Sequence, residues 1–164
     1  MTLADIRRTE ERLGVGFHHD FVALLLNYNG GTPQAKFVTI PYFPSGKRIA
    51  STEWAPVGIP VGIIEEFTTL TGSATCSLDS VFQQLRKAED RQTGSQDRVA
   101  AGRYVPIAAS ITQTAEPNTH VYFVMEHLPQ PLPTVWCIWT GHVPMTPAFA
   151  APSLPQLLAN TFGE

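Results

Sequence analysis

Apolar residues recur at helical spacing in the first thirty positions of the chain. The first apolar stripe consists of Leu3, Ile6 and Leu13. Glu10 interrupts this stripe, while Arg7, Arg8, Glu11 and Arg12 face water. Thr2 is the expected N-cap and Gly14 the expected stop, because these residue types favour those positions. The pattern therefore predicts an amphipathic helix over residues 3–13.

A second helix is predicted from about His18 to Tyr28, where apolar side chains share one wide face. This face consists of Phe21, Leu24, Leu25 and Tyr28, widened by Val22 and Leu26. A face of this width predicts a helix that is mostly buried.

The second helix is followed at once by Asn29, Gly30, Gly31 and, after one residue, Pro33. Glycine and asparagine accept a positive φ most cheaply, and proline prevents the helix from resuming. A phosphate-binding loop has its glycines before a helix, whereas here they follow one. We therefore interpret this segment as a helix stop, and a positive φ at Gly30 implies that Gly30→Val costs at least about 1–2 kcal/mol of stability.

From residue 36 onward the pattern changes to short β-type runs broken by proline and glycine. The predicted strands are 36–43, 63–70 (a strand or a short helix), 104–110, 119–126 and 134–141. A third helix is expected after Ser77, with Leu78, Val81, Phe82 and Leu85 on its apolar face. A closing helix is expected from Leu154 to Phe162, packing Leu157, Leu158 and Phe162 on the sheet.

This order of elements predicts an α+β fold in one domain over residues 1–164. We expect an N-terminal helical pair and a mostly antiparallel central β-sheet with further helices packed on it. A length of 164 residues and a hydrophobic content of 43% are enough for one sizeable core.

The charge balance restricts the possible partners. A formal net charge of -3 argues against non-specific nucleic-acid binding, which needs a basic face. The N-terminal segment lacks the apolar core of a signal peptide, and no run approaches the roughly 18 apolar residues of a membrane span. Cys76 and Cys137 have no CxxC companion, so buried thiols are expected rather than a disulfide framework. These features together predict a cytoplasmic protein.

Several histidines and acidic residues invite a metal-site interpretation, which their spacing does not favour. His18 and His19 precede Asp20, but adjacent helical residues point about 100° apart and rarely share one ion. We expect them to be surface residues at a helix start. His120 and Glu126 share a face of one predicted strand, but lie about 20 Å apart at ~3.3 Å per residue. His127 is a further candidate beside Glu126, and His142 could join this group only through folding.

The other candidates for catalysis are equally weak. Cys137 sits between two large apolar residues, which is typical of core packing. Glu65 and Glu66 are adjacent and so point apart on a helix or a strand, which disfavours a general acid/base pair. No dinucleotide-binding or P-loop pattern occurs. We therefore predict a protein without enzymatic activity, catalytic residues, bound metal or cofactor.

The order of these motifs resembles the SUKH superfamily, which includes bacterial immunity proteins and a fungal regulator of cell-wall synthesis. The sharpest match is "IRRTEERLGVGFHHDFVALLLNYNGGTP", in which Asn29, Gly30 and Gly31 stand on the family's structural signature. Weaker matches follow in order at "YVPIAAS", "VWCIWTGH" and "APSLPQLLANTF". The resemblance implies a single SUKH-like domain that binds a protein partner.

The most frequent role in this family is neutralising a cognate bacterial toxin, often a nuclease or a deaminase, inside the cell that makes it. The resemblance thus implies an immunity protein of a polymorphic toxin or toxin–antitoxin system. The alternative is a regulatory or scaffolding member that binds a host protein. The identity of the partner, the face that binds it and the oligomeric state do not follow from the sequence.

Candidate partner-binding residues come from an irregular, proline-punctuated segment and from nearby acidic positions. Aromatic and arginine anchors with a polar rim are typical of protein interfaces. The first group is Tyr42, Phe43, Lys47, Arg48, Glu53 and Trp54. Glu65 and Glu66 could meet a basic cleft of a nuclease. The alternatives are that the aromatic residues complete the core beneath a long loop and that the carboxylates are solvated surface charge.

Overall fold

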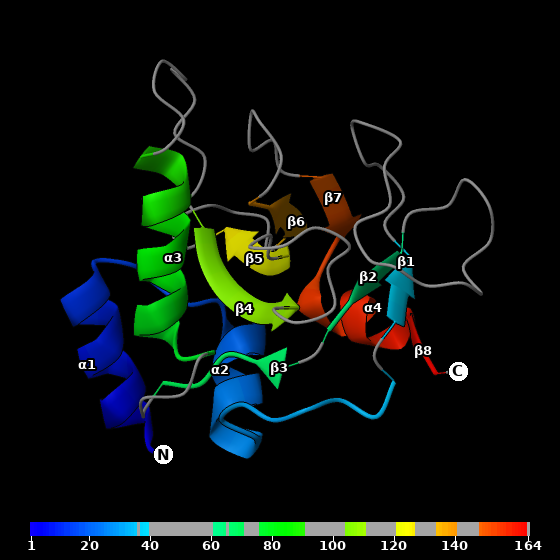
Figure 1. Cartoon of the computed structure of the whole chain (residues 1–164). Coiled ribbons are helices and arrows are strands. Elements are labelled where there is room, and N and C mark those ends of the chain that lie inside the picture. The colour runs from blue at the N-terminus through cyan, green and yellow to red at the C-terminus, as the bar shows by residue number, and fades with distance from the viewer. Residues whose placement is uncertain are drawn as a thin grey trace.

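Two helices open the chain in the computed structural model, as the hydrophobic pattern predicts. They are α1 (Leu3–Leu13) and α2 (His19–Asn27). The structure describes residues 1–35, 37–39, 61–64, 66–70, 76–90, 104–110, 121–126, 134–140 and 148–163. Within these residues the helical pair is followed by two β-sheets and two further helices, α3 (Leu78–Asp90) and α4 (Leu154–Ala159) (Figure 1).

The larger sheet has the strand order β3-β4-β5-β6-β7, with every neighbouring pair antiparallel. Its strands are β3 (Glu66–Phe67), β4 (Tyr104–Ser110), β5 (Val121–Glu126), β6 (Val135–Trp139) and β7 (Ala148–Ala151). The smaller sheet has the order β2-β1-β8 and consists of β1 (Phe37–Thr39), β2 (Val61–Ile63) and β8 (Thr161–Phe162). The predicted α+β class, with a mostly antiparallel sheet and helices packed on it, is confirmed.

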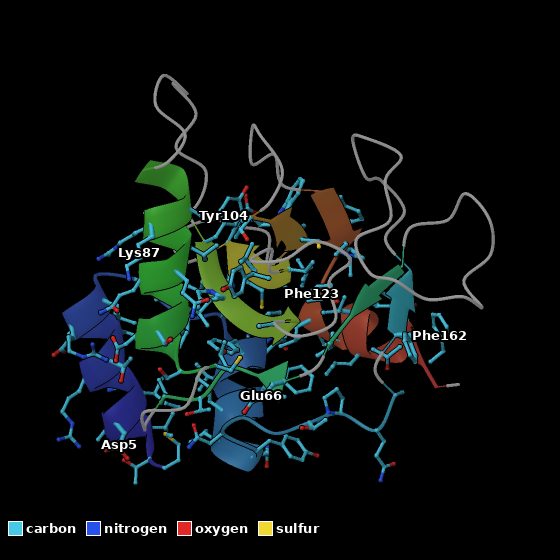
Figure 2. All side chains as sticks on the ribbon, in the orientation of Figure 1. Asp5, Glu66, Lys87, Tyr104, Phe123 and Phe162 are labelled. Carbon is cyan, nitrogen blue, oxygen red and sulfur yellow. The ribbon has the colours of Figure 1, made fainter. Side chains whose placement is uncertain are left out.

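Strand β5 lies at the centre of the larger sheet and is buried on both faces. Successive strand residues point to opposite faces, so one face of β5 carries Val121, Phe123 and Met125 and the other Tyr122 and Val124. The first face shares a core with α2 and α4, while the second packs with Val81 and Leu85 of α3. Phe123 accordingly lies inside the molecule (Figure 2). Helices therefore cover both sides of the sheet, which explains why this strand has almost no polar residues.

Two boundaries and the packing of one side chain differ from the sequence-based prediction. The segment 63–70 is not one element, because β2 ends at Ile63 and β3 begins at Glu66. The closing helix does not reach Phe162: it ends at Ala159, and Phe162 pairs with Phe37 in β8, with ring centroids 5.8 Å apart. Leu158 is 37% exposed rather than packed on the sheet.

Strand β7 does not follow from the hydrophobic pattern. Its sequence, Ala-Phe-Ala-Ala, has weak strand propensity because alanine favours helices. Pairing with β6 on one side nevertheless holds it extended, which is a tertiary effect.

Helix α1 has well-formed ends, which agree with the prediction of Thr2 and Gly14 as its boundaries. The Thr2 side chain accepts a hydrogen bond from the Asp5 backbone, and the Asp5 carboxylate accepts one from the Thr2 backbone at 2.8 Å. Gly14 is left-handed at φ 69°, and the amides of Gly14 and Val15 donate to the carbonyls of Glu11 and Glu10. These caps fix where α1 starts and where the chain leaves it.

The residues after α2 form a tight turn with three consecutive positive φ values: 40° at Asn29, 99° at Gly30 and 105° at Gly31. The Asn29 Oδ1 accepts a hydrogen bond of 3.0 Å from the backbone of Leu70, and the Gly31 carbonyl accepts one of 2.9 Å from Phe67. Gly30 is buried against the side chain of Thr69. The interpretation of this segment as a helix stop is confirmed: the turn binds the protein's own backbone.

Substitution of these two glycines separates backbone strain from packing. A Cβ atom at Gly30 would lie 2.8 Å from the Thr69 Cγ2, whereas one at Gly31 would meet nothing within 4 Å. Both residues have similar φ values, so both substitutions are strained by about 1–2 kcal/mol. The Thr69 contact adds about 1–3 kcal/mol of overpacking at Gly30 alone.

We therefore expect Gly30→Ala to reduce the free energy of unfolding by about 2–5 kcal/mol and Gly31→Ala by about 1–2 kcal/mol. Urea denaturation of both variants and the parent protein measures the difference. Equal losses for the two variants would show that contact with Thr69 does not restrict Gly30.

Candidate functional site

Most of the predicted partner-binding residues lie outside the residues that the structure describes. These are Tyr42, Phe43, Lys47, Arg48, Glu53, Trp54 and Glu65. Glu66 lies within the described residues and is half-buried in β3, where it pairs with Ala109 of β4 (Figure 2). Its backbone carbonyl accepts a hydrogen bond of 3.6 Å from the Cys76 thiol. For these residues partner binding stays a prediction.

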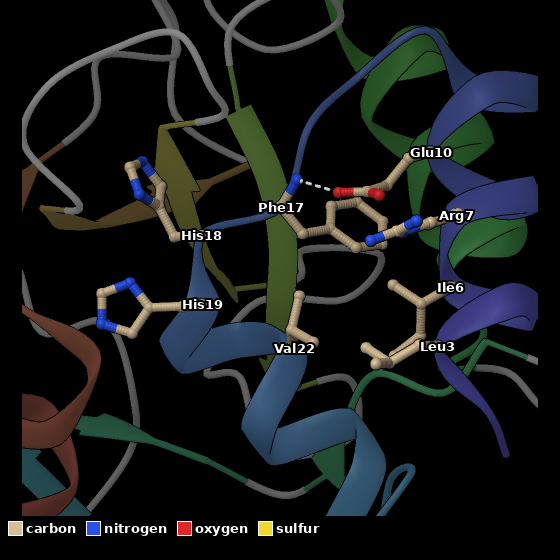
Figure 3. A pocket seen from close by; sticks show the side chains of 8 residues that line it. All are labelled: Leu3, Ile6, Arg7, Glu10, Phe17, His18, His19 and Val22. Carbon is tan, nitrogen blue, oxygen red and sulfur yellow. Dashed lines mark hydrogen bonds between the residues drawn. The ribbon is translucent and has the colours of Figure 1, made fainter.

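A groove lies between α1 and the start of α2. Its volume is about 350 Å³. It is lined by Leu3, Ile6, Arg7, Glu10, Phe17, His18, His19 and Val22. Figure 3 shows Arg7 and Glu10 on the α1 side and the two histidines across from them, with Phe17 and Val22 between.

The apolar residues of the groove are buried at its floor and exposed to solvent at its rim. Ile6 and Phe17 are buried, and the Phe17 ring packs edge-on against Phe21 with centroids 5.2 Å apart. Val22 is partly buried, and Leu3 is 52% exposed. An apolar surface that begins in the core and ends in solvent can accept an apolar side chain from outside, since contact removes its rim from water.

Glu10 explains why a charged residue interrupts the apolar stripe of α1. Its Oε1 atom accepts a hydrogen bond of 2.6 Å from the backbone amide of Phe17 (Figure 3). Charge-assisted hydrogen bonds of this kind are stronger than neutral ones. The carboxylate therefore joins α1 to the segment that leads into α2 and holds one wall of the groove in place.

The three arginines of α1 are in different electrostatic environments. Arg8 pairs with Asp5 at 2.7 Å, and Arg12 pairs with Asp79 of α3 at 2.5 and 3.1 Å. The hydrogen bond to Asp79 raises the pKa of Arg12. Arg7 lines the groove and has no carboxylate oxygen within 4.0 Å among the described residues. Its guanidinium is thus available for a group that enters the groove.

The histidines do not lie as expected. The sequence predicts both on the surface, but His18 is buried as the N-cap residue of α2, because the chain turns inward between Phe17 and Phe21. His19 is exposed, and its Nε2 lies 3.2 Å from the Asp20 carboxylate. Among the residues that the structure describes, no three metal-ligating side chains gather at one point. His120, His127 and His142 lie outside those residues.

Cys137 and Glu126 are occupied in the fold itself. Cys137 is fully buried in β6, and burial raises the pKa of its thiol far above the ordinary value. The Glu126 carboxylate accepts a hydrogen bond of 2.9 Å from the Thr134 hydroxyl, which connects the ends of β5 and β6. The interpretation of Cys137 as a core residue is confirmed.

Exposed large apolar side chains concentrate on the helical pair. Among the described residues they are Met1, Leu3, Leu26, Tyr28 and Leu158, of which all but the last belong to α1, α2 or their flanks. Tyr28 is 74% exposed at the end of α2. Leu26 follows Val22 by one turn of α2, so the two share a face that continues the groove.

Sequence reasoning missed this groove because it predicted the second helix to be mostly buried and the charged residues of the first helix to face water. The only sequence signal was Glu10, whose place within an apolar stripe implied a specific partner. Arg7 resembles its neighbours Arg8 and Arg12 in sequence, and only the folded contacts distinguish the three.

Comparisons with protein-family models, with curated proteins and with solved structures found no match to this chain. No helix in the described part of the chain has both the length and the apolar character needed to cross a lipid bilayer.

The environments of the two thiols predict low reactivity in the folded protein. Neither Cys76 nor Cys137 forms a disulfide and both are 0% exposed, and only a thiolate attacks a disulfide reagent readily. We expect both thiols to react with an aromatic disulfide reagent at least about a hundredfold more slowly in native protein than in protein unfolded by urea, because reaction requires local opening.

Absorbance of the released thiolate at pH 8 measures both rates, and Cys76→Ala isolates Cys137. Reaction of native Cys137 at the rate of the unfolded chain would contradict its burial and would restore its candidacy as a nucleophile.

Proposed function

We propose that this chain is a non-enzymatic protein-binding module, namely a cytoplasmic immunity protein that binds and neutralises a cognate bacterial toxin. The toxin class that the SUKH resemblance favours is a nuclease or a deaminase. Binding occludes the toxin and requires no catalytic residue, metal or cofactor in this chain.

The observation that carries the proposal is the gathering of exposed apolar side chains around a preformed groove on the helical pair. Leu3, which is 52% exposed, lines a groove of about 350 Å³ whose floor includes the buried Phe17. The exposed Leu26 lies one turn after the lining residue Val22 on α2. Exposed apolar surface with charged residues at its rim is typical of protein-interaction sites. Four of the five exposed large apolar residues in the described part of the chain belong to α1, α2 or their flanks.

The SUKH resemblance supplies the second line of support. Its sharpest part spans α1, α2 and the turn at Asn29, Gly30 and Gly31, and these residues take one defined arrangement with backbone contacts to residues 67–70. The groove lies on the same helical pair. The part of the sequence that carries the resemblance and the part that exposes apolar surface are therefore the same.

Co-expression with the product of the adjacent gene in a sensitive host tests the immunity role. We expect growth to depend on this chain, and the two proteins to purify as a stable complex. A catalytically inactive variant of the neighbouring protein serves as the control for toxicity.

Unchanged growth with no complex, from a neighbouring protein that is shown to be toxic elsewhere, would contradict the immunity role. That result would favour a regulatory or scaffolding module that binds a host protein.

A further inference from the structure

We infer that the groove between α1 and α2 takes an acidic amphipathic segment of the partner, whose apolar side chain enters the groove and whose carboxylate pairs with Arg7. This inference rests on the proposed protein-binding function and assigns the chemistry of the segment that is bound. It concerns the helical pair rather than the segments predicted from the sequence to hold the interface.

The shape of the groove defines the apolar part of the occupant. Its volume of about 350 Å³ lies at the lower end of ligand pockets, which span roughly 300–1,000 Å³. Ile6 and Phe17 form a buried floor, whereas Leu3 and Val22 stand at the sides. This space suits one or two large apolar side chains of a protein segment. Leu26, one turn beyond Val22, extends the contact surface along α2.

The charges that face the groove define the polar part of the occupant. α1 contributes Arg7 and Glu10, and the start of α2 contributes His19 with Asp20 beside it. Glu10 is engaged by the Phe17 amide at 2.6 Å, and Asp20 lies 3.2 Å from His19. These two carboxylates thus have a partner, while the Arg7 guanidinium has no carboxylate partner among the described residues.

A carboxylate is the group that matches this arrangement. Arginine pairs with carboxylates through a planar fork of N–H donors, which gives geometric specificity. The N-terminus of α2 borders the groove and adds the positive end of a helix dipole. An acidic group next to an apolar anchor therefore satisfies both features of the groove, and insertion of an amphipathic segment into a groove is a common mode of protein recognition.

Selection from a library of random twelve-residue peptides displayed on phage tests this chemistry and does not require the partner to be identified first. We expect the chain to enrich peptides that combine Leu, Ile, Phe or Trp with Asp or Glu within one helical turn. Two charge-reversal variants then separate local pairing from general electrostatics. Arg7→Glu and Arg8→Glu change the net charge equally, and the two arginines are consecutive residues of α1.

For a selected peptide we expect Arg7→Glu to weaken binding at least about tenfold and Arg8→Glu less than about threefold, since Arg8 already pairs with Asp5. Fluorescence anisotropy with a synthetic copy of the peptide measures both. Equal weakening by the two variants would overturn the role of Arg7, and enrichment without acidic residues would overturn the assigned chemistry.

A second pair of variants tests the place of binding. Leu3→Glu puts a charge at the rim of the groove, and the fold should tolerate it because Leu3 is exposed and a glutamate suits the first turn of a helix. Leu158→Glu introduces the same charge on α4 and serves as its control. Peptide binding should be lost in the first variant and kept in the second. Binding that survives Leu3→Glu in folded protein would overturn the groove as the site.

The growth assay keeps this inference separate from the immunity role. Neutralisation that survives both Arg7→Glu and Leu3→Glu would overturn the groove as the toxin-binding surface while the immunity role stands. Loss of neutralisation in these two variants, with Arg8→Glu and Leu158→Glu still protective, supports the groove. Selected acidic peptides without any toxin neutralised would overturn the immunity role alone.

Discussion

The turn at Asn29–Gly31 is the constraint on which the placement of the helical pair depends. Its three positive φ values reverse the chain directly after α2, and its polar groups bind the backbone at Phe67 and Leu70. These hydrogen bonds join segments about forty positions apart in the sequence and attach the end of α2 to the edge of the larger sheet. Because Gly30 has no side chain, the backbone can approach Thr69 closely enough for both bonds to form.

The groove is a consequence of how α1 is then attached to α2. Glu10 binds the Phe17 amide, and Gly14 ends α1 so that the chain can return toward that carboxylate. Ile6 and Phe17 share the core with Phe21, but Leu3 and Val22 extend past its edge. The groove is the space that remains beside these contacts, and the exposed Leu3 stands at its rim.

The centre of the fold is built in a contrasting way. β5 is covered on both faces, and the thiol of Cys137 is closed off from solvent. The hydroxyl of Tyr122 donates to the Gln84 side chain of α3, and burial of this side chain raises its pKa. This hydrogen bond joins α3 to the larger sheet.

The sequence by itself determined the local structure: α1 with its caps, α2 with its stop, α3, and the three strands β4, β5 and β6. Each of these elements depends on the period of its apolar residues or on a residue with a strong conformational preference. Both signals act between residues that are close in the sequence. Tertiary structure alone decided β7, the pairing of Phe162 with Phe37, the burial of His18 and the separate roles of Arg7, Arg8 and Arg12. These features depend on contacts between residues that are far apart in the sequence. Such contacts exist only in the folded chain.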